Sequence, residues 1–470
     1  MNKTSYCSLL FIALLFCFRL NAQSVNPELV SILDFTLDSM HTEVPAKSLS
    51  AAIVFSDGSV WKNVEGISSE TPLVNVTTDD TYLIGSIVKT ITSGCILQLH
   101  DEGVLSIEDS IHEWLPPIEY VNPNITIRQL LQHKSGLYDV LSNPALQPVM
   151  LGNVSQIWTA EEVLNQYLLA PINNPGGNWS YCNTNYFLLG MIIEAATGNP
   201  FYVEFRNRFF DPLGLSTFGI PAFEDFDQPV AHVWMDLFGS GQTQDAHFFY
   251  SQYLSLNSIA GAAGGYYATP EDVSKWMWQY MRGNLLEEAT LEDAKTTVIA
   301  PGLPNTTYGL GLNRKTFAGH VGYGHGGDLA YSASSWYFPD FDLSITVCGN
   351  DADVISWELI PVVQELLEHI EDSNLLSISS NHSNRDAIYI YPNPSAEVTT
   401  LDFSGFNSNQ WISIEVMNAH GEILNSFKEH RTVAEKQYVE ISIRDLSSGV
   451  YFIRCSDENK NIITHKLLKS

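Results

Sequence analysis

The sequence predicts an α/β protein in which an antiparallel sheet is flanked by helices, carries an inserted helical domain and is followed by a small all-β sandwich. Strand-like segments at residues 50–64 and 308–349 lie on either side of a long helical region. Amphipathic helical patterns lie outside them, at 27–41 and 357–370. Short strand-like runs separated by turn residues then fill residues 387–470, which is typical of a small β-sandwich.

The N-terminal elements follow from periodicity and turn residues. Leu29, Ile32, Leu33 and Leu37 recur at helical spacing. Strands are expected at 50–55 and 60–64 because an Asp57-Gly58 turn joins them. An extended run over 79–84 precedes an apolar helix at 90–99, and Gly103 follows as a helix stop.

Helices and loops are expected from about residue 100 to 220, and strands return after residue 308. Thr126 is expected to cap a short helix, and Thr269 followed by Pro270 is a strong helix start. Pro339-Asp340 indicates a hairpin between two strands. The predicted helices are 126–133, 161–169, 186–197, 201–210 and 273–281, and the hairpin strands are 331–338 and 343–348. A ligand cleft is expected between the sheet and the helical insertion.

The N-terminus has the pattern of a signal peptide over residues 1–23. Lys3 gives a basic start, Leu9–Phe18 is apolar, and Leu20–Gln23 resembles a cleavage region. The apolar run is too short to span a bilayer, and no other stretch is long and apolar enough. We therefore expect an exported protein without a membrane span.

The remaining chain divides by composition. Residues 24–372 are expected to form one domain that includes the insertion at about 100–220. Residues 373–384 are rich in serine and asparagine, so a linker is expected over 373–386, before the sandwich at 387–470.

Charge and cysteine usage exclude several classes of function. The 470 residues include 23 Lys and Arg against 53 Asp and Glu, a net charge of −30. Nucleic acids and anionic membranes need basic surfaces, so neither is an expected partner. Beyond the signal peptide the cysteines are far apart and no Cys/His spacing fits zinc, so we expect free buried thiols and no metal or cofactor. These cysteines are Cys95, Cys182, Cys348 and Cys455.

Ser86-Ile-Val-Lys89 is the first chemical motif, at the start of the apolar helix. Residues three apart share one helix face, so Ser86 and Lys89 are expected to lie together. A lysine can activate a serine nucleophile if its surroundings suppress its charge. The same spacing also occurs at Ser59 and Lys62, in the predicted hairpin, where the two would not act together.

Three later segments accompany this motif in a fixed order. They are Ile125–Leu137 with His133-Lys-Ser-Gly136, Pro175–Tyr186 with Tyr181-Cys-Asn183, and Tyr323–Asp328 with His325-Gly-Gly. Together the four resemble the serine β-lactamase/penicillin-binding-protein superfamily, in its class C-like branch, over about residues 28–370. That branch includes DD-peptidases, D-aminopeptidases and esterases, and the resemblance implies its fold.

The resemblance implies a role for each matching residue. Ser86 would be the acylated nucleophile, and Lys89 would provide a proton path to its hydroxyl group. Tyr181 would act as general base in acylation and activate water in deacylation, either as a phenolate or as a proton relay.

The substrate would be held by the residues around this group. Asn183 would donate to the substrate, and the backbone N–H groups of Ser86 and Asp328 would form the oxyanion hole. Gly327 beside them would supply the room for this geometry. His133 is expected to be structural, bonding carbonyl groups at its helix end.

His325 stands where the family's β-lactamases usually carry lysine. A histidine is neutral over part of the physiological range, so it holds a carboxylate less reliably. We therefore expect a secreted hydrolase that forms an acyl-enzyme on a small peptide, amide or ester substrate, of D-alanyl-D-alanine carboxypeptidase, D-aminopeptidase or esterase type. The alternatives are a true serine β-lactamase and a catalytically silent binding protein. Specificity is expected in cleft loops at 143–158 and 223–257.

The C-terminal region carries a second resemblance. Tyr391-Pro-Asn-Pro-Ser395, Leu446–Ile453 and the basic end Lys466–Lys469 resemble a sorting domain of the type IX secretion system. This implies the secretion machinery as a partner, and export through the periplasm to the surface or exterior of a Gram-negative bacterium. The alternative is a carbohydrate- or protein-binding sandwich.

Overall fold

The structure, a computed structural model, describes the first part of the chain almost continuously and the C-terminal part mainly through its strands. The described residues are 25–247, 253–303, 305–373, 375, 389–391, 398–402, 410–418, 423–431, 438–447, 449–457 and 462–469. The chain forms two compact units, Met1–Leu376 and Ser377–Ser470. The predicted signal peptide and nearly all of the predicted linker lie outside the described residues, apart from the end of the last helix and residue 375.

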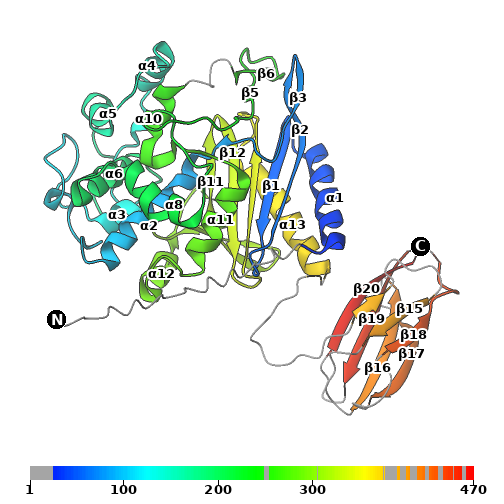
Figure 1. Cartoon of the computed structure of the whole chain (residues 1–470). Coiled ribbons are helices and arrows are strands. Elements are labelled where there is room, and N and C mark those ends of the chain that lie inside the picture. Colours follow the sequence, from blue (N-terminus) through cyan, green and yellow to red (C-terminus); the bar gives the residue numbers. More distant parts are fainter. Residues whose placement is uncertain are drawn as a thin grey trace, which may run out of the picture. The chain divides into compact units, whose positions relative to one another are not determined.

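An antiparallel sheet forms the centre of the first unit (Figure 1). Its strand order in the described residues is β3-β2-β1-β13-β12-β11-β10-β9-β8. Leu49 in β1 pairs with Glu65 on one side and Gly349 on the other, so strands from both ends of the unit meet in the middle of the sheet. This confirms the predicted sheet. The strands are β1 (Ser48–Val54), β2 (Val60–Glu70), β3 (Leu73–Asn75), β8 (Val298–Ile299), β9 (Thr306–Tyr308), β10 (Asn313–Phe317), β11 (His320–Leu329), β12 (Tyr331–Phe338) and β13 (Leu343–Gly349).

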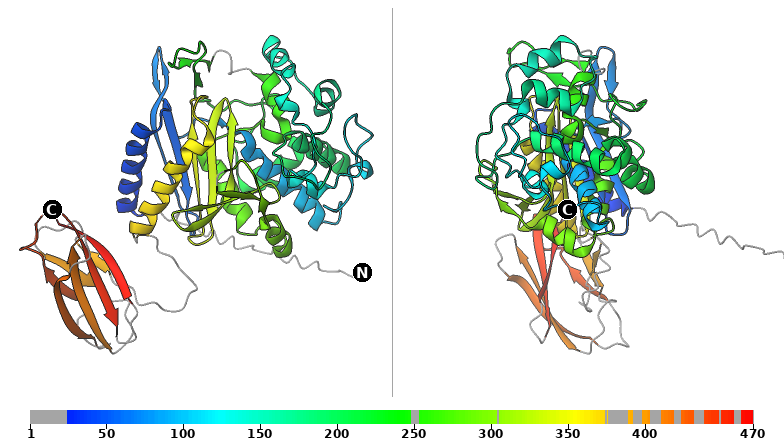
Figure 2. Two further views of the ribbon diagram at one scale, coloured as in Figure 1. Left: turned by 180° about the vertical axis from the view of Figure 1, so that it is seen from behind. Right: turned by 90° about the vertical axis from the view of Figure 1, so that its left-hand side faces the viewer.

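Helices α1 (Pro27–Glu43) and α13 (Ile360–Ser373) lie side by side on one face of the sheet (Figure 2). Asn26 caps α1 by accepting a hydrogen bond from the Glu28 amide, and Pro27 occupies the first turn. The apolar stripes of both helices pack on buried residues of β1, β12 and β13 in one core. These are the two amphipathic helices that periodicity predicts.

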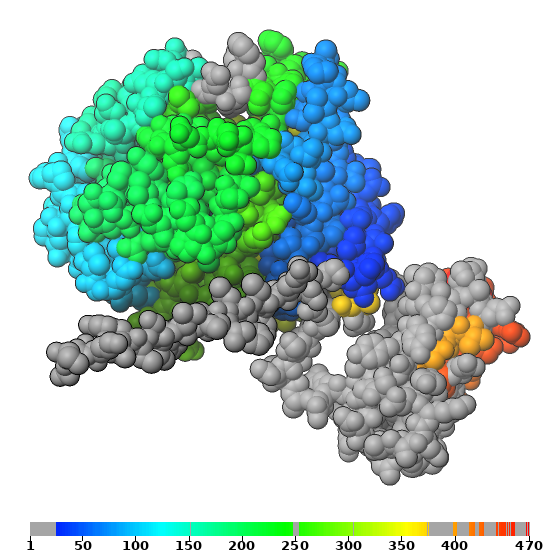
Figure 3. Space-filling view, viewed as in Figure 1, coloured from blue at the N-terminus to red at the C-terminus, as the bar shows by residue number. Residues whose placement is uncertain are grey.

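The opposite face of the sheet is covered by the helical part of the unit, whose residues form a continuous surface beside β2 and β3 (Figure 3). Thr269 caps α11 as expected, accepting from the Asp272 amide, and α11 packs on β1, β12 and β13. Trp276 of α11 is fully buried and bonds Thr90 of α2. The helices are α2 (Val88–Asp101), α3 (Ile127–Leu131), α4 (Leu146–Gly152), α5 (Ala160–Tyr167), α6 (Thr184–Thr197), α7 (Phe201–Phe205), α8 (Asp211–Leu213), α10 (Leu254–Gly264), α11 (Pro270–Met281) and α12 (Glu288–Lys295).

Shorter elements connect these layers. A π-helical turn, Arg206–Phe210, follows α7 where one continuous helix is expected. The expected extended run before Ser86 forms only a two-residue strand, which pairs with β7 beside the helix start. The short strands are β4 (Tyr82–Leu83), β5 (Trp234–Met235), β6 (Gln244–Asp245) and β7 (Tyr267–Ala268), and the 3₁₀ turns are η1 (Gly85–Ile87), η2 (Ile111–Glu113), η3 (Val140–Ser142) and η5 (Ser356–Leu359).

The second unit consists of two small antiparallel sheets with a shared apolar core. Leu401 and Ile441 come from one sheet, and Ile414, Ile453 and Leu467 come from the other. This confirms the predicted all-β module, although β17 is an additional strand that turn signals do not indicate. The sheets are β14 (Tyr389–Tyr391), β15 (Val398–Asp402) and β18 (Tyr438–Ser442), and β17 (Ile423–Arg431), β16 (Gln410–Asn418), β19 (Gly449–Asp457) and β20 (Ile462–Lys469).

Two further expectations concern the described residues as a whole. All four cysteines named above are buried and free, as predicted. Across the described ranges, no helix is long and apolar enough to cross a membrane.

Candidate active site

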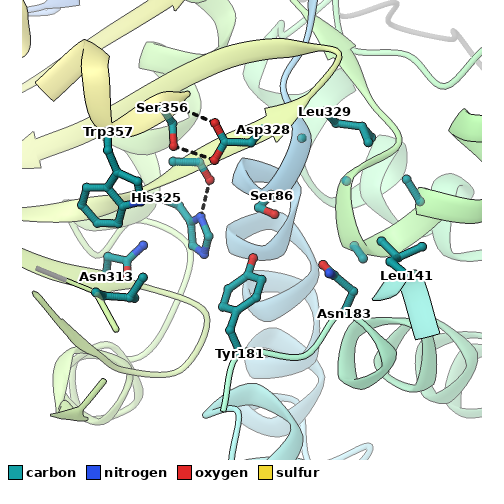
Figure 4. A pocket seen from close by; sticks show the side chains of 16 residues that line it. Ser86, Leu141, Tyr181, Asn183, Asn313, His325, Asp328, Leu329, Ser356 and Trp357 are labelled. Carbon is teal, nitrogen blue, oxygen red and sulfur yellow. Dashed lines mark hydrogen bonds between the residues drawn. The ribbon is translucent and has the colours of Figure 1, made fainter. Parts of the chain in front are cut away.

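A pocket of about 360 Å³ opens where β11 meets the N-terminus of α2 (Figure 4). Its wall includes Ser86, Tyr181, Asn183, His325 and Asp328, which come from three separate segments of the chain. Of the other two predicted site residues, Lys89 lies buried beneath Ser86 and Gly327 packs against the turn that carries Ser86. The structure therefore brings all seven together.

Ser86 lies in η1, immediately before α2, and Lys89 lies in the first turn of α2. The Lys89 ammonium group is fully buried and has three hydrogen-bond partners. Nζ lies 2.9 Å from Ser86 Oγ, 2.8 Å from Asn183 Oδ1 and 2.7 Å from the Ala263 carbonyl oxygen. Ala263 belongs to α10, which kinks at Gly261, and the neighbouring Ala262 carbonyl accepts from Thr92 of α2.

These partners fit a neutral amine at Lys89. The Asn183 and Ala263 oxygens can only accept, so they use two N–H groups, and the remaining position faces a hydroxyl group that can itself donate. Burial lowers the pKa of Lys89 to about 7, against an opposing attraction to Asp139. A large fraction of the protein molecules therefore carries an uncharged amine beside Ser86 at neutral pH.

Asp139 is a site residue that the sequence analysis does not identify. Its carboxylate accepts from Asn183 Nδ2 at 2.9 Å and from the Asn183 amide at 3.3 Å. This fixes the side-chain amide so that Oδ1, and not Nδ2, faces Lys89. In the sequence Asp139 has only the signal of a cap, and it does cap η3 by accepting from Leu141.

The Tyr181 side chain lies in the pocket with its hydroxyl group directed toward Ser86 (Figure 4). The Lys89 Nζ is 5.1 Å from the centre of the Tyr181 ring. The hydroxyl group is buried and makes no hydrogen bond within the described part of the chain. Burial raises the pKa of Tyr181 well above its usual value, although nearby Ser86 opposes this. The resting side chain is therefore a neutral phenol, which favours a proton relay over a phenolate base.

His133 supports this tyrosine from behind. The two ring centres are 4.3 Å apart, and burial lowers the pKa of His133 well below its usual value. Its Nδ1 accepts from the Cys182 amide at 3.1 Å, which fixes the backbone between Tyr181 and Asn183. The expectation that the His133 side chain bonds carbonyl groups at the helix end is wrong, because Nδ1 accepts from the Cys182 amide instead.

Two glycines allow β11 to approach η1 closely. Gly85 has φ +53°, and a Cβ atom there would lie 2.9 Å from the Asp328 amide nitrogen. A Cβ atom on Gly327 would overlap the Ile84 carbonyl oxygen and lie 3.1 Å from the Ser86 nitrogen. The backbone amides of Ser86 and Asp328 therefore lie at the same contact, as an oxyanion hole requires.

His325 lies on β11 with both ring nitrogens engaged. Nδ1 donates to the Gly326 carbonyl at 2.5 Å, so Nε2 is the acceptor for the Tyr308 hydroxyl at 3.1 Å. Burial, together with the charge of Lys89, lowers the pKa of His325 to about 3. The ring is therefore uncharged over the whole physiological range. Tyr308, which donates to Nε2, is a second residue that no sequence motif indicates.

Ser356 is a third unpredicted residue of the site. A Cβ atom on Gly326 would lie 2.5 Å from Ser356 Oγ, so this serine of η5 occupies the space that a side chain at position 326 would need. Ser356 also donates to Asp328 through its amide at 2.5 Å and its hydroxyl at 2.8 Å (Figure 4).

The other Ser-x-x-Lys pair has no comparable site. Ser59 lies in the β1–β2 turn, where its amide donates to Asp57, and Lys62 forms an ion pair with Glu271 at 2.8 Å. In the described parts of the chain, no cluster of three or more metal-binding side chains occurs.

Comparison with known proteins gives two family matches. The model described as Beta-lactamase matches residues 40–355, and that described as Secretion system C-terminal sorting domain matches residues 389–470. The chain is 24% identical to penicillin-binding protein 4* of Bacillus subtilis over 314 residues, 62% of this chain and 65% of that protein. It is 26% identical to a D-aminopeptidase of Cereibacter sphaeroides over 64% of this chain and 53% of that protein.

Two solved structures have a similar fold. A D-stereospecific amidohydrolase from Streptomyces sp. has a TM-score of 0.61 at 29% identity, over 68% of this chain and 94% of that one. A D-amino acid amidase from Ochrobactrum anthropi SV3 shares the fold, with a TM-score of 0.64 at 24% identity over 74% and 99%.

The chain spans 46% to 65% of the length of the first curated relatives. The Beta-lactamase match nevertheless covers more than half of the chain and includes all seven predicted site residues. The chain therefore belongs to the beta-lactamase family and ends in a secretion sorting domain.

Proposed function

We propose that the protein is a secreted serine hydrolase that acts on amide or ester substrates through an acyl-enzyme at Ser86. The observation that carries the proposal is the buried Lys89 amine, 2.9 Å from Ser86 Oγ and with a pKa of about 7. A lysine that serves only a structural purpose would be costly to bury without a counter-ion in contact. An uncharged amine in this position is what a serine nucleophile requires.

In acylation, Ser86 Oγ attacks the substrate carbonyl carbon while its proton passes to Lys89 Nζ. The carbonyl oxygen becomes an oxyanion and is stabilised by the backbone amides of Ser86 and Asp328, at a few kcal/mol per donor. The bond to the leaving amine or alcohol then breaks, and the carbonyl carbon stays on Ser86 as an ester.

Tyr181 completes the proton path. Its neutral hydroxyl group faces Ser86, so it can donate to the leaving group and take up the proton that Lys89 holds. In deacylation the same groups run in reverse: a water molecule loses a proton to the Tyr181–Lys89 pair and attacks the ester carbon. The bond to Oγ then breaks, and Ser86 recovers its proton.

His325 distinguishes among the substrate types. A neutral imidazole, bonded through both nitrogens, offers no charge to a substrate carboxylate. D-Alanyl-D-alanine peptides and β-lactams both carry such a carboxylate, so a D-aminopeptidase or esterase type is favoured over a carboxypeptidase or β-lactamase. The likeness to the Streptomyces D-stereospecific amidohydrolase supports an amide substrate.

The experiment is active-site labelling of the purified protein with a fluorescent fluorophosphonate and, separately, a fluorescent penicillin. We expect the fluorophosphonate to label the wild type but not Ser86→Ala. Ser59→Ala is the matched control, because it alters the other Ser-x-x-Lys pair, and it should label fully. If neither probe labels the wild type, the result would support a silent binding protein. Equal labelling of Ser86→Ala would contradict Ser86 as the nucleophile. Turnover of nitrocefin would support the β-lactamase alternative.

The sorting-domain match supports export by the type IX secretion machinery to the cell surface or medium of a Gram-negative bacterium. Deletion of residues 377–470 should leave the hydrolase unit in the periplasm, as measured by immunoblots of cell fractions. Release of the truncated protein into the medium at the wild-type level would contradict this.

A further inference from the structure

The charge of the pocket wall suggests what the substrate carries. Among the residues that line the pocket, Asp328 alone has a charged side chain, because His325 is neutral. Lys89 lies below the wall, and its three hydrogen bonds are all made to the protein. A substrate that enters the pocket therefore meets a single negative charge and no accessible positive one.

Within the described residues, no cationic side chain forms an ion pair with the Asp328 carboxylate. Ser356 donates to each oxygen once, which leaves further lone pairs on both. Loss of solvation raises the pKa of Asp328, and the charge that acts on it most is that of Glu358, another acid. Asp328 is exposed and lines the pocket. A cation placed there would remove both the repulsion and the unmet solvation.

The position of Asp328 on β11 relates this charge to the reacting bond. Its own amide is one of the two oxyanion donors proposed above, so the substrate carbonyl oxygen would lie against Asp328. β10 pairs with β11 only up to Gly324, opposite Asn313, so the segment 325–329 has no strand beside it on that side. A substituent on the carbon next to the carbonyl would lie within reach of the Asp328 side chain.

We infer that this pocket accepts amides or esters of amino acids whose α-amino group is free and protonated, with the Asp328 carboxylate pairing with that ammonium group. The inference rests on the proposed function and names the substrate class of the same site. It assigns Asp328 a side-chain role in specificity, separate from that of its backbone amide. Substrates that place a carboxylate in the pocket are disfavoured by the same charge.

Two chromogenic substrates of nearly equal size test the inference. One is phenylalanine p-nitroanilide, as its D and L forms, and the other is 3-phenylpropanoyl p-nitroanilide, which lacks only the amino group. The wild type should prefer the amino substrate in kcat/KM at pH 7. Asp328→Asn should reduce that preference about tenfold to a hundredfold, the range for a hydrogen bond between charged groups. The rate on the deamino substrate should change much less.

Asp57→Asn is the matched control. It removes one negative charge from the β1–β2 turn, where Asn-Gly keeps the turn chemistry of Asp-Gly. This turn lies at the opposite end of the sheet from Asp328. Val54, near the turn, pairs with Ser344 at one end of β13. Asp328 pairs with Ser332, which pairs with Gly349 at the other end of β13. The substrate preference should not change.

The outcomes separate the possible roles. If Asp328→Asn lowers both rates equally, the side chain only holds η5 through Ser356, and the inference is wrong. It is also wrong if the preference persists, or if the wild type prefers the deamino substrate. Failure of the proposed function itself would give a different result: fluorophosphonate would not label Ser86 in the wild type.

Discussion

Replacement of Lys89 by methionine should abolish hydrolysis and yet stabilise the protein at moderately acidic pH. Methionine has a similar length and keeps the apolar stem of the lysine. It removes an amine that the fold desolvates completely. The expected gain in stability is a direct consequence of the lowered pKa of Lys89.

The magnitude follows from linkage between protonation and folding. The pKa of Lys89 falls from 10.5 in the unfolded chain to about 7 in the folded one. Each pKa unit corresponds to about 1.4 kcal/mol, so burial of the protonated amine costs about 5 kcal/mol below pH 7. Loss of its three hydrogen bonds opposes the gain by about 1 kcal/mol each. A net stabilisation of about 2 kcal/mol at pH 6.5 remains.

The pH dependence is the sharper test, because the lost hydrogen bonds cancel between two pH values. Between pH 7 and 10.5 the unfolded chain binds more protons at Lys89 than the folded chain, so wild-type stability rises with pH through this group. Lys89→Met lacks that rise. Its stability relative to the wild type should therefore fall by about 2 to 3 kcal/mol between pH 6.5 and pH 9.

The assay is chemical denaturation followed by tryptophan fluorescence at both pH values. Lys62→Met is the control: Lys62 pairs with Glu271, and its pKa is raised, so it stays charged throughout this range. Lys62→Met should be no more stable than the wild type. The difference between the two in free energy of unfolding should be the same at both pH values. A pH-independent difference for Lys89→Met would refute the reasoning, because it would mean that the folded protein keeps Lys89 protonated.

Three further predictions concern catalysis. The kcat/KM of the wild type should rise with pH through a midpoint near 7 as Lys89 loses its proton, and a flat profile between pH 5.5 and 8 would argue against this base. Asp139→Asn should move that midpoint to lower pH, because the Asp139 charge favours the protonated amine; an unmoved midpoint would exclude this effect. Tyr181→Phe should lower kcat by about 10²- to 10⁴-fold on a substrate with a poor leaving group while fluorophosphonate still labels Ser86, and a near-normal rate would remove Tyr181 from the proton path.

The sheet and the two flanking helices are predictable because their patterns are local. Periodicity gives α1 and α13, and Thr269-Pro270 marks the start of α11 within the sequence itself. The kinked helix α10 is not predictable in this way. Nearly all of its residues are buried, so it has no exposed polar face to give an amphipathic pattern.

Some residues of the candidate site are likewise predictable from the sequence, and others are not. Ser86, Tyr181 and His325 belong to short motifs whose residue types suggest chemistry. Asp139 and Tyr308 act through hydrogen bonds to residues that are far away in sequence, namely Asn183 and His325. No spacing rule relates such pairs, because the fold brings them together. The same holds for the Ala263 carbonyl, since a backbone oxygen leaves no mark in the sequence.

The pairing of β1 with β13 at the centre of the sheet affects how this protein can be made. Leu49 cannot pair with Gly349 until nearly the whole first unit has been synthesised. Such a high contact order slows folding, because a long loop must close before the central strands gain any hydrogen bonds. A chain arrested before residue 343 would leave one edge of β1 and one edge of β12 unpaired and open to other chains, and it would be prone to aggregate. The first unit should therefore tolerate shortening at its surface loops far better than at β13.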